Sequence, residues 1–223
     1  MKKYVIASSK EWFGKAEKSS EFLGIEFISI KNKDELTLQN LSKINPRFVF
    51  FPHWNWIVPK EIYEAYECVV FHTAPLPYGR GGSPIQNLIV RNIENAPVCA
   101  LRMNEVLDGG PIYGSIEISL AGTCEEIFKR IAEAVQALIV DIIKNEPKPI
   151  EQKGEPIYFN RRKPSENKLP ESASLTEIYN RIRMLDAAEY PKAFIEYGDF
   201  IIEFTNANNL TDSVAATVQI KRK

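Results

Sequence analysis

The sequence of 223 residues is poor in cysteine and histidine, with three of the first and two of the second. The cysteines are widely spaced and form no Cys-x-x-Cys motif or Cys/His cluster. An odd number of scattered cysteines argues against a disulfide framework, and the missing cluster argues against a zinc site. We therefore predict a protein without a metal, whose thiols are reduced and lie in a cytosolic core: Cys68, Cys99 and Cys124.

Long apolar runs and a strong net charge are missing as well. The N-terminal sequence MKKYVIASSKEW lacks the apolar core of a signal peptide, and no other run reaches the length of a membrane span. The formal net charge of −1 argues against a large nucleic-acid interface, although a local basic patch is compatible with it. We expect a cytoplasmic protein with no membrane partner and no nucleic-acid partner.

Three common functional motifs are absent. Gly79, Gly81 and Gly82 do not form a GxGxxG motif after the first strand, and no GKS or GKT follows a glycine-rich loop. No serine lies in a GxSxG context. The sequence thus argues against binding of a dinucleotide or a nucleoside triphosphate, and against a serine nucleophile of that type.

What is present is an alternation of short apolar runs with helical patterns. Strands are predicted at residues 3–8, 24–30, 47–54, 68–73, 96–104 and 111–120. Helices are predicted at residues 10–23, 33–44, 59–66, 83–92 and from Thr123 to about Asn145, the last with a capping box. This order predicts an α/β fold, an open and mostly parallel Rossmann-like sheet flanked by helices, over residues 1–150.

The remaining residues, 151–223, are predicted to form a linker and a small α+β C-terminal subdomain. Residues 148–171 are proline-rich and charged, and a helix follows at residues 174–186. Strands begin at Ala193, with turns at residues 197–199 and 206–209. The tail is too short for its own core, so we expect it to pack on the main domain. Its apolar strands would suit the contact of a homodimer.

One histidine lies in a context that suggests chemistry. His72 ends a predicted strand and precedes a loop rich in proline and glycine, and Asp108 occupies another strand-to-loop junction before Gly109 and Gly110. Such junctions converge at one edge of an open sheet, and an aspartate there would orient the histidine and favour its charged form. The alternatives are a structural histidine and an aspartate that only forms a turn.

A second candidate feature is the run His53-Trp54-Asn55-Trp56-Ile57. Two tryptophans around an amide could form a wall for a flat ring, or both could belong to the core. His53 is interpreted as structural.

The stretch FHTAPLPYGRGGSPIQN resembles the N-formyltransferase family, whose signature is N-x-H-P/G-S-L-L-P-x-x-R-G-x-x-P-I followed by D-x-G. The resemblance extends to residues 56–59, 107–112, 161–164 and 182–194, and so covers most of the chain. The layout is closest to bacterial nucleotide-sugar N-formyltransferases, with methionyl-tRNA formyltransferases also similar. The matching residues of the signature are His72, Leu76, Pro77, Arg80, Gly81, Pro84 and Ile85.

The resemblance implies that a primary amine attacks the formyl carbon of 10-formyltetrahydrofolate without a metal, and that residues 1–150 are the catalytic domain. His72 would stabilise the oxyanion or relay the amine proton, and Asp108 would orient it. The implied folate contacts are Trp54, Trp56, Ile57, Leu107 and Asp108. The implied substrate contacts are Arg80, Gly81, Gly82, Ser83, Arg181 and Arg183.

One position departs from the family pattern. The family asparagine two residues before the histidine is Val70 here. Its amide helps to hold the oxyanion, and loss of such a donor costs roughly 2.7–4 kcal/mol. Asn55 and Asn104 both end predicted strands that could neighbour His72. We favour Asn55 as a third catalytic residue, because its strand directly precedes that of His72.

The acceptor of the formyl group is predicted from the tail. Residues 158–223 hold ten Lys or Arg against nine Asp or Glu, so the short tail is not basic. We favour an amino sugar linked to a nucleotide, in surface-glycan synthesis such as a pseudaminic-acid-type pathway, with Arg161, Arg162, Arg181 and Arg183 as phosphate contacts or merely solvated charges. The alternatives are methionyl-tRNA formyltransferase-like activity, formyltetrahydrofolate hydrolysis, or a non-catalytic folate or nucleotide-sugar binder. Retention of His72 and Asp108 argues against the binder.

Overall fold

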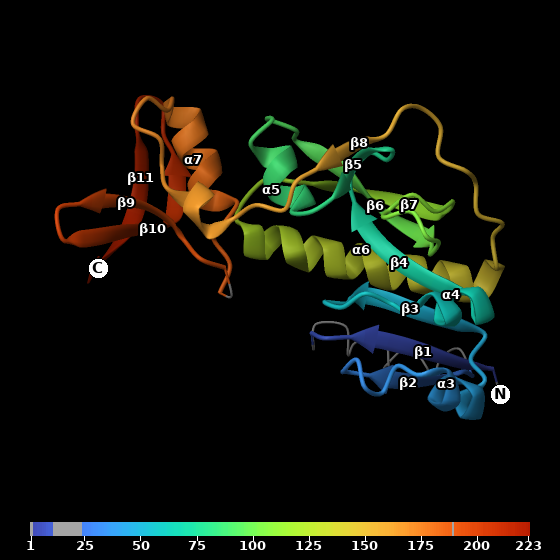
Figure 1. Ribbon diagram of the computed structural model, residues 1–223. Coiled ribbons are helices and arrows are strands. Elements are labelled where there is room, and N and C mark those ends of the chain that lie inside the picture. Colours follow the sequence, from blue (N-terminus) through green and yellow to red (C-terminus); the bar gives the residue numbers. More distant parts are fainter. Residues whose placement is uncertain (1, 11–23, 189) are drawn as a thin grey trace.

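The computed structural model describes residues 2–10, 24–188 and 190–223. The helix predicted over residues 10–23 falls almost entirely outside these ranges. The main sheet has the strand order β2-β1-β3-β4-β6-β7, and helices pack on both of its faces (Figure 1). The strands are β1 (Lys3–Ser8), β2 (Glu26–Ile30), β3 (Phe48–His53), β4 (Cys68–Thr73), β6 (Asn95–Arg102) and β7 (Ile112–Ser119).

The predicted open, mostly parallel sheet is confirmed. Strands β2, β1, β3 and β4 pair in parallel, whereas β6 is antiparallel to β4 and β7 is antiparallel to β6. The antiparallel β6–β7 pair needs only the loop of residues 103–111 between its strands. That loop carries Asp108 and begins at the edge of the sheet where β4 starts. Its first residue, Met103, donates a backbone hydrogen bond to Cys68 O at the start of β4.

The apolar run of β3 is explained by burial of both faces of the sheet. Phe48 and Phe50 pack in the core that includes α6 (Cys124–Asn145), and Val49 and Phe51 pack in a second core. Side chains of a strand alternate between its two faces, so a strand covered on both sides needs a continuous apolar sequence. The second core is covered by α3 (Leu38–Ile44) and α4 (Lys60–Ala65).

Helix starts follow local hydrogen bonding. The capping box of α6 is confirmed, since Thr123 Oγ1 accepts from Glu126 N at 3.3 Å and the Glu126 carboxylate accepts from Thr123 N at 2.8 Å. The prediction that a helix begins at residue 33 is wrong. Thr37 is the N-cap of α3 and accepts from Asn40 N at 3.1 Å, because residues 32–36 form a turn before it.

A two-stranded parallel sheet escaped prediction. It pairs β5 (Tyr78–Gly81) with β8 (Ile157–Phe159). The chain after α6 runs back along the main domain, so that β8 lies beside β5 (Figure 1). Glycine-rich β5 and solvent-facing β8 have weak strand patterns, and only their mutual pairing makes them strands. The boundary near residue 150 stays a prediction.

The C-terminal part is α+β, as predicted. It contains the 3-10 helix η2 (Pro164–Asn167) and α7 (Leu175–Arg183), and its sheet has the order β11-β10-β9. The strands are β9 (Ala193–Tyr197), β10 (Phe200–Asn209) and β11 (Val214–Arg222). The turn predicted at residues 206–209 is wrong. Asn206 adopts a φ of 52° within β10, where the register shifts as in a bulge, and the chain turns at residues 210–213.

Two further absences concern only the described residues. None of their helices combines the length and the apolarity needed to cross a membrane. Within the same ranges, no group of three or more His, Cys, Asp or Glu side chains is arranged to hold a metal ion.

The three cysteines are free and buried. Burial raises the pKa of each thiol, Cys68, Cys99 and Cys124, to about 12. Because only the thiolate reacts with disulfide reagents, we expect the native protein to react with Ellman's reagent far more slowly than the protein unfolded in guanidinium, which should release all three equivalents. Fast stoichiometric reaction of the native protein would contradict this.

Candidate active site

The first residue of the site is His72, on β4. The residue is 8% exposed, and Nε2 lies 2.7 Å from the carbonyl oxygen of Gly79. A carbonyl oxygen can only accept, so Nε2 carries the proton of this hydrogen bond. The other ring nitrogen, Nδ1, faces Asp108, with 3.4 Å to Oδ2. An acceptor oxygen therefore faces each ring nitrogen.

Asp108 is held by the backbone around it. Its own φ is 49°, a left-handed conformation, and its Oδ2 accepts a hydrogen bond from Gly81 N at 2.8 Å. The carboxylate is nearly buried, with 12% of the side chain exposed. The structure thus brings the two predicted residues together, but not by the predicted route: β6 is antiparallel to β4, so the Asp108 loop begins where β4 starts and extends toward His72 near its end. One carboxylate oxygen lies between the histidine and a backbone amide.

The glycine-rich loop meets the segment that follows α6. Gly81 has a φ of 100°, and a Cβ there would lie 2.5 Å from Phe159 O. Gly82 N donates to Phe159 O at 3.0 Å, and Ser83 Oγ accepts from Arg162 N at 3.1 Å. Ser83 occupies the N-cap position of α5 (Pro84–Ile89), but its hydroxyl caps no amide of that helix within the described residues and accepts from Arg162 N. The backbone amides of Gly81 and Gly82 are thus already hydrogen-bonded within the protein.

Sequence reasoning missed Gln152. Its Oε1 accepts from Arg80 Nη2 at 2.7 Å and from Arg80 Nε at 3.1 Å. Its Nε2 donates to the carbonyl oxygens of Asp108 and Gly110, at 2.8 and 2.9 Å. No local pattern marks this residue, which lies in the patternless segment assigned to a linker.

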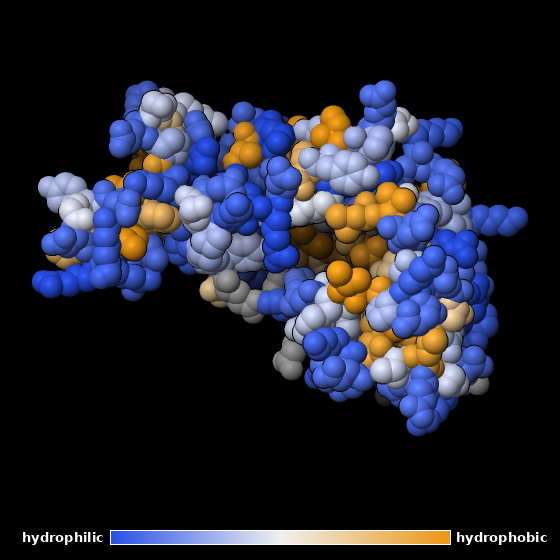
Figure 2. Space-filling view, in the orientation of Figure 1, coloured by the Kyte–Doolittle hydropathy of each residue, from blue (hydrophilic) through white to orange (hydrophobic). Residues whose placement is uncertain are grey.

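Trp54 and Trp56, the two tryptophans predicted to contact the folate, have different surroundings. Trp54 and Trp56 make an edge contact, with ring centroids 4.9 Å apart, and Trp54 also packs on Phe51. Trp56, Ile57 and Leu107 are exposed. Figure 2 shows an apolar hollow beside the ends of β3 and β4. Both interpretations of the tryptophans thus hold in part: Trp54 is largely a core residue, and Trp56 faces outward.

The position of the family amide is occupied by an alkyl group. Val70 is two residues before His72 on β4, hence on the same face of the sheet, between Phe51 of β3 and Leu101 of β6. Asn55 is exposed, and the polar groups at the two ring nitrogens of His72 are Gly79 O and Asp108 Oδ2. The Asn104 side chain accepts from Val106 N at 2.9 Å. The role assigned to Asn55 stays a prediction without a contact to support it.

Helix α7, which carries the two predicted arginines, lies away from β4 (Figure 1). Arg183 is buried and donates to the carbonyl oxygens of Leu120 and Gly122. Arg181 pairs with Glu177 at 2.8 Å. Arg183 thus fastens α7 to the main domain, and we do not carry it into the substrate site.

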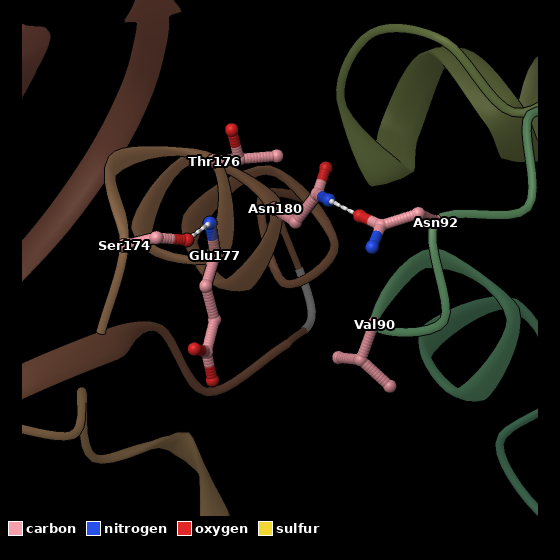
Figure 3. A pocket seen from close by; sticks show the side chains of 6 residues that line it. All are labelled: Val90, Asn92, Ser174, Thr176, Glu177 and Asn180. Atoms are coloured by element: carbon pink, nitrogen blue, oxygen red, sulfur yellow. Dashed lines mark hydrogen bonds between the residues drawn. The ribbon is translucent and has the colours of Figure 1, made fainter. Parts of the chain in front are cut away.

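A small hollow of about 190 Å³ lies where α7 meets the end of α5. Figure 3 shows Asn180 donating to Asn92, at 3.0 Å, across this junction. The residues that line it are Val90, Asn92, Ser174, Thr176, Glu177 and Asn180. Neither His72 nor Asp108 is among them.

His53 is not part of the pair, in agreement with its structural interpretation; its Nδ1 lies 3.1 Å from Ser9 Oγ. Burial lowers its pKa below the ordinary 6.5, and Lys10 lowers it further. The unfolded chain therefore takes up this proton at higher pH than the folded chain, so stability falls as the pH drops through about 6.5. We expect His53→Gln to flatten the fall in unfolding free energy between about pH 7.5 and 5.5, measured by urea titration. An unchanged slope would contradict this.

The fold and the site define an open-sheet α/β protein with a buried histidine–aspartate pair at a strand end. Methionyl-tRNA formyltransferase from Clostridium thermocellum has a TM-score of 0.94 and 40% identity over 100% of both chains. A family model described as "Methionyl-tRNA formyltransferase, C-terminal domain" matches residues 164–221. The chain belongs to the formyltransferase family.

More distant proteins add two facts. Methionyl-tRNA formyltransferase of Campylobacter jejuni subsp. jejuni serotype O:6 is 30% identical over 181 residues, 80% of this chain but 59% of that protein, so the chain spans about 59% of this relative's length. A sugar N-formyltransferase from Shewanella sp FDAARGOS_354 has a TM-score of 0.67 and 16% identity, over 97% of this chain and 96% of that one, and shows the fold alone. The predicted co-substrate is confirmed for the family, which uses 10-formyltetrahydrofolate.

Proposed function

We propose that this chain transfers the formyl group of 10-formyltetrahydrofolate to a primary amine, with His72 and Asp108 as the catalytic pair. The observation that carries the proposal is the buried His72 ring, held between Gly79 O at 2.7 Å and Asp108 Oδ2 at 3.4 Å at a strand end. Membership of the formyltransferase family agrees with this chemistry.

The donor would bind in the apolar hollow beside β3 and β4 (Figure 2). Trp56, Ile57 and Leu107 expose large apolar surfaces, 38%, 95% and 64% of each residue. Exposed apolar groups near polar catalytic groups are typical of a ligand pocket, and Leu107 directly precedes Asp108. The indole N–H of Trp54 is buried and finds no acceptor among the described residues, so it could bond a polar atom of the folate.

In the proposed reaction the amine nitrogen bonds to the formyl carbon, and the bond from that carbon to the folate nitrogen breaks. The amine proton ends on the departing tetrahydrofolate. His72 lies where it could stabilise the intermediate oxyanion or pass that proton, while Asp108 fixes the ring. Because Val70 offers no hydrogen bond, we expect slower turnover than an enzyme with the family asparagine, unless Asn55 or Trp54 supplies the donor.

For the acceptor, the similar proteins favour methionyl-tRNA over the amino sugar that the charge balance of residues 158–223 suggested. The protein with 40% identity over both full chains is named a methionyl-tRNA formyltransferase, and the C-terminal match has the same name. Two proteins whose descriptions name them sugar N-formyltransferases share the fold at only 16% identity. We therefore rank the amine of methionyl-tRNA first and keep the nucleotide-linked amino sugar as the second candidate, which the ten-to-nine charge balance of residues 158–223 supports.

The test follows tetrahydrofolate release by absorbance, with methionyl-tRNA or a panel of nucleotide-linked amino sugars as the acceptor. Turnover with methionyl-tRNA, weakened by added salt, would support the first candidate; turnover with one sugar would support the second. Release without any amine would indicate a hydrolase, and folate binding without turnover a non-catalytic binder. Either of the last two outcomes would overturn the transferase. Asn55→Ala with unchanged turnover would remove Asn55 from the site.

A further inference from the structure

Gln152 joins three parts of the site that are far apart in sequence. Both protons of its side-chain amide go to carbonyl oxygens of the Asp108 loop, those of Asp108 and Gly110. Its oxygen receives both bonds from Arg80, on β5. The orientation of the amide is unambiguous, because a guanidinium only donates and a carbonyl only accepts. The four bonds use the full hydrogen-bonding capacity of both donors and both lone pairs.

The two hydrogen bonds from Gln152 go to residues of the loop whose backbone is conformationally restricted. Asp108 has a φ of 49°, which L-residues rarely adopt. At Gly110 the chain passes so close to β6 that a Cβ would lie 1.7 Å from Arg102 O. Gln152 thus adds two hydrogen bonds to the loop at these two residues. The conformation of this loop determines where Asp108 Oδ2 lies, which is between Gly81 N and His72 Nδ1.

We infer that Gln152 is a positioning residue, which acts through Asp108 and makes the catalytic pair depend on the docking of residues 150–159. This inference rests on the proposed function for its kinetic consequence, but its structural part does not. A residue that merely helps the segment to dock would affect β5 and β8 as a unit. A positioning residue would affect the contact of Asp108 selectively.

Two neighbouring amides separate these possibilities. Gly81 N donates to Asp108 Oδ2 and reports the position of the carboxylate. Gly82 N donates to Phe159 O and reports the docking of β8. Hydrogen exchange followed by NMR reads both amides in the intact protein. The informative variant is Gln152→Glu, which keeps an acceptor for Arg80 but has no proton for the two carbonyl oxygens. Gln152→Leu removes all four bonds, and Lys153→Gln is the exposed neighbour used as a control.

In Gln152→Glu we expect Gly81 to exchange roughly tenfold faster, with Gly82 and the Lys153→Gln control unchanged. The kcat of formyl transfer should fall roughly 10²-fold, with a much smaller change in KM. Unchanged Gly81 exchange in both Gln152 variants would overturn the inference, and so would equal acceleration of Gly81 and Gly82 in Gln152→Glu. If the unaltered protein transfers no formyl group, the proposed function fails while the exchange arm still decides the role of Gln152.

Discussion

Replacing His72 by asparagine is expected to lower the kcat of formyl transfer by roughly 10²–10⁴-fold, the usual contribution of an acid–base or charged catalytic group. An asparagine amide can still donate to Gly79 O, so the variant keeps a partner for that buried carbonyl. It cannot carry a positive charge toward Asp108 or relay a proton. The loss should therefore appear in kcat, with the unfolding free energy changed far less. Tetrahydrofolate release and urea unfolding measure the two quantities.

The chain supplies its own control, because its second histidine is His53. His53→Asn should leave kcat unchanged, since that side chain bonds Ser9 and not the Asp108 carboxylate. Equal activity of the His72→Asn variant and the unaltered protein would contradict the catalytic assignment and return His72 to a structural role. Equal loss in both variants would point to instability as the common cause.

The elements that local sequence could predict are those whose stabilising contacts are local or periodic. The apolar run of β3 indicates a strand covered on both faces, and Thr123 with Glu126 marks the start of α6. The start of α3 could not be placed, because the spacing of its leucines continues through a turn that side chains stabilise. The pairing of β5 with β8 joins segments about eighty residues apart, and neither has a strand pattern of its own.

The site divides in the same way. His72 and Asp108 are predicted to meet because strand ends of an open sheet share one edge, and the structure places them 3.4 Å apart. The reason differs from the predicted one, since β6 is antiparallel to β4 and the loop that carries Asp108 begins where β4 starts. Gln152 could not be found, because its role comes from the chain returning across β5. The packing role of Arg183 could not be predicted either. Its charge suggested a phosphate contact, but the packing of α7 on the main domain turns its donors to the carbonyl oxygens of Leu120 and Gly122.

The second large effect is expected from Gly81→Ala, which should destabilise the protein by about 3 kcal/mol or more. A Cβ at this position would lie 2.5 Å from the backbone oxygen of Phe159, and a backbone atom cannot swing aside as a side chain can. The φ of 100° adds strain for any residue with a Cβ. Relief requires β8 to move away from β5, which also displaces the amide that bonds Asp108. Activity should therefore fall with stability.

Gly198→Ala separates the clash from the backbone strain. Gly198 also has a positive φ, 54°, but a Cβ there meets nothing within 4 Å. Its substitution should cost only about 1–2 kcal/mol, the penalty of the left-handed conformation, and leave kcat unchanged. Guanidinium unfolding of both variants gives the comparison. If Gly81→Ala cost no more than Gly198→Ala, the close approach of β8 to the loop would not exist in solution, and the coupling of residues 150–159 to the catalytic pair would fall with it.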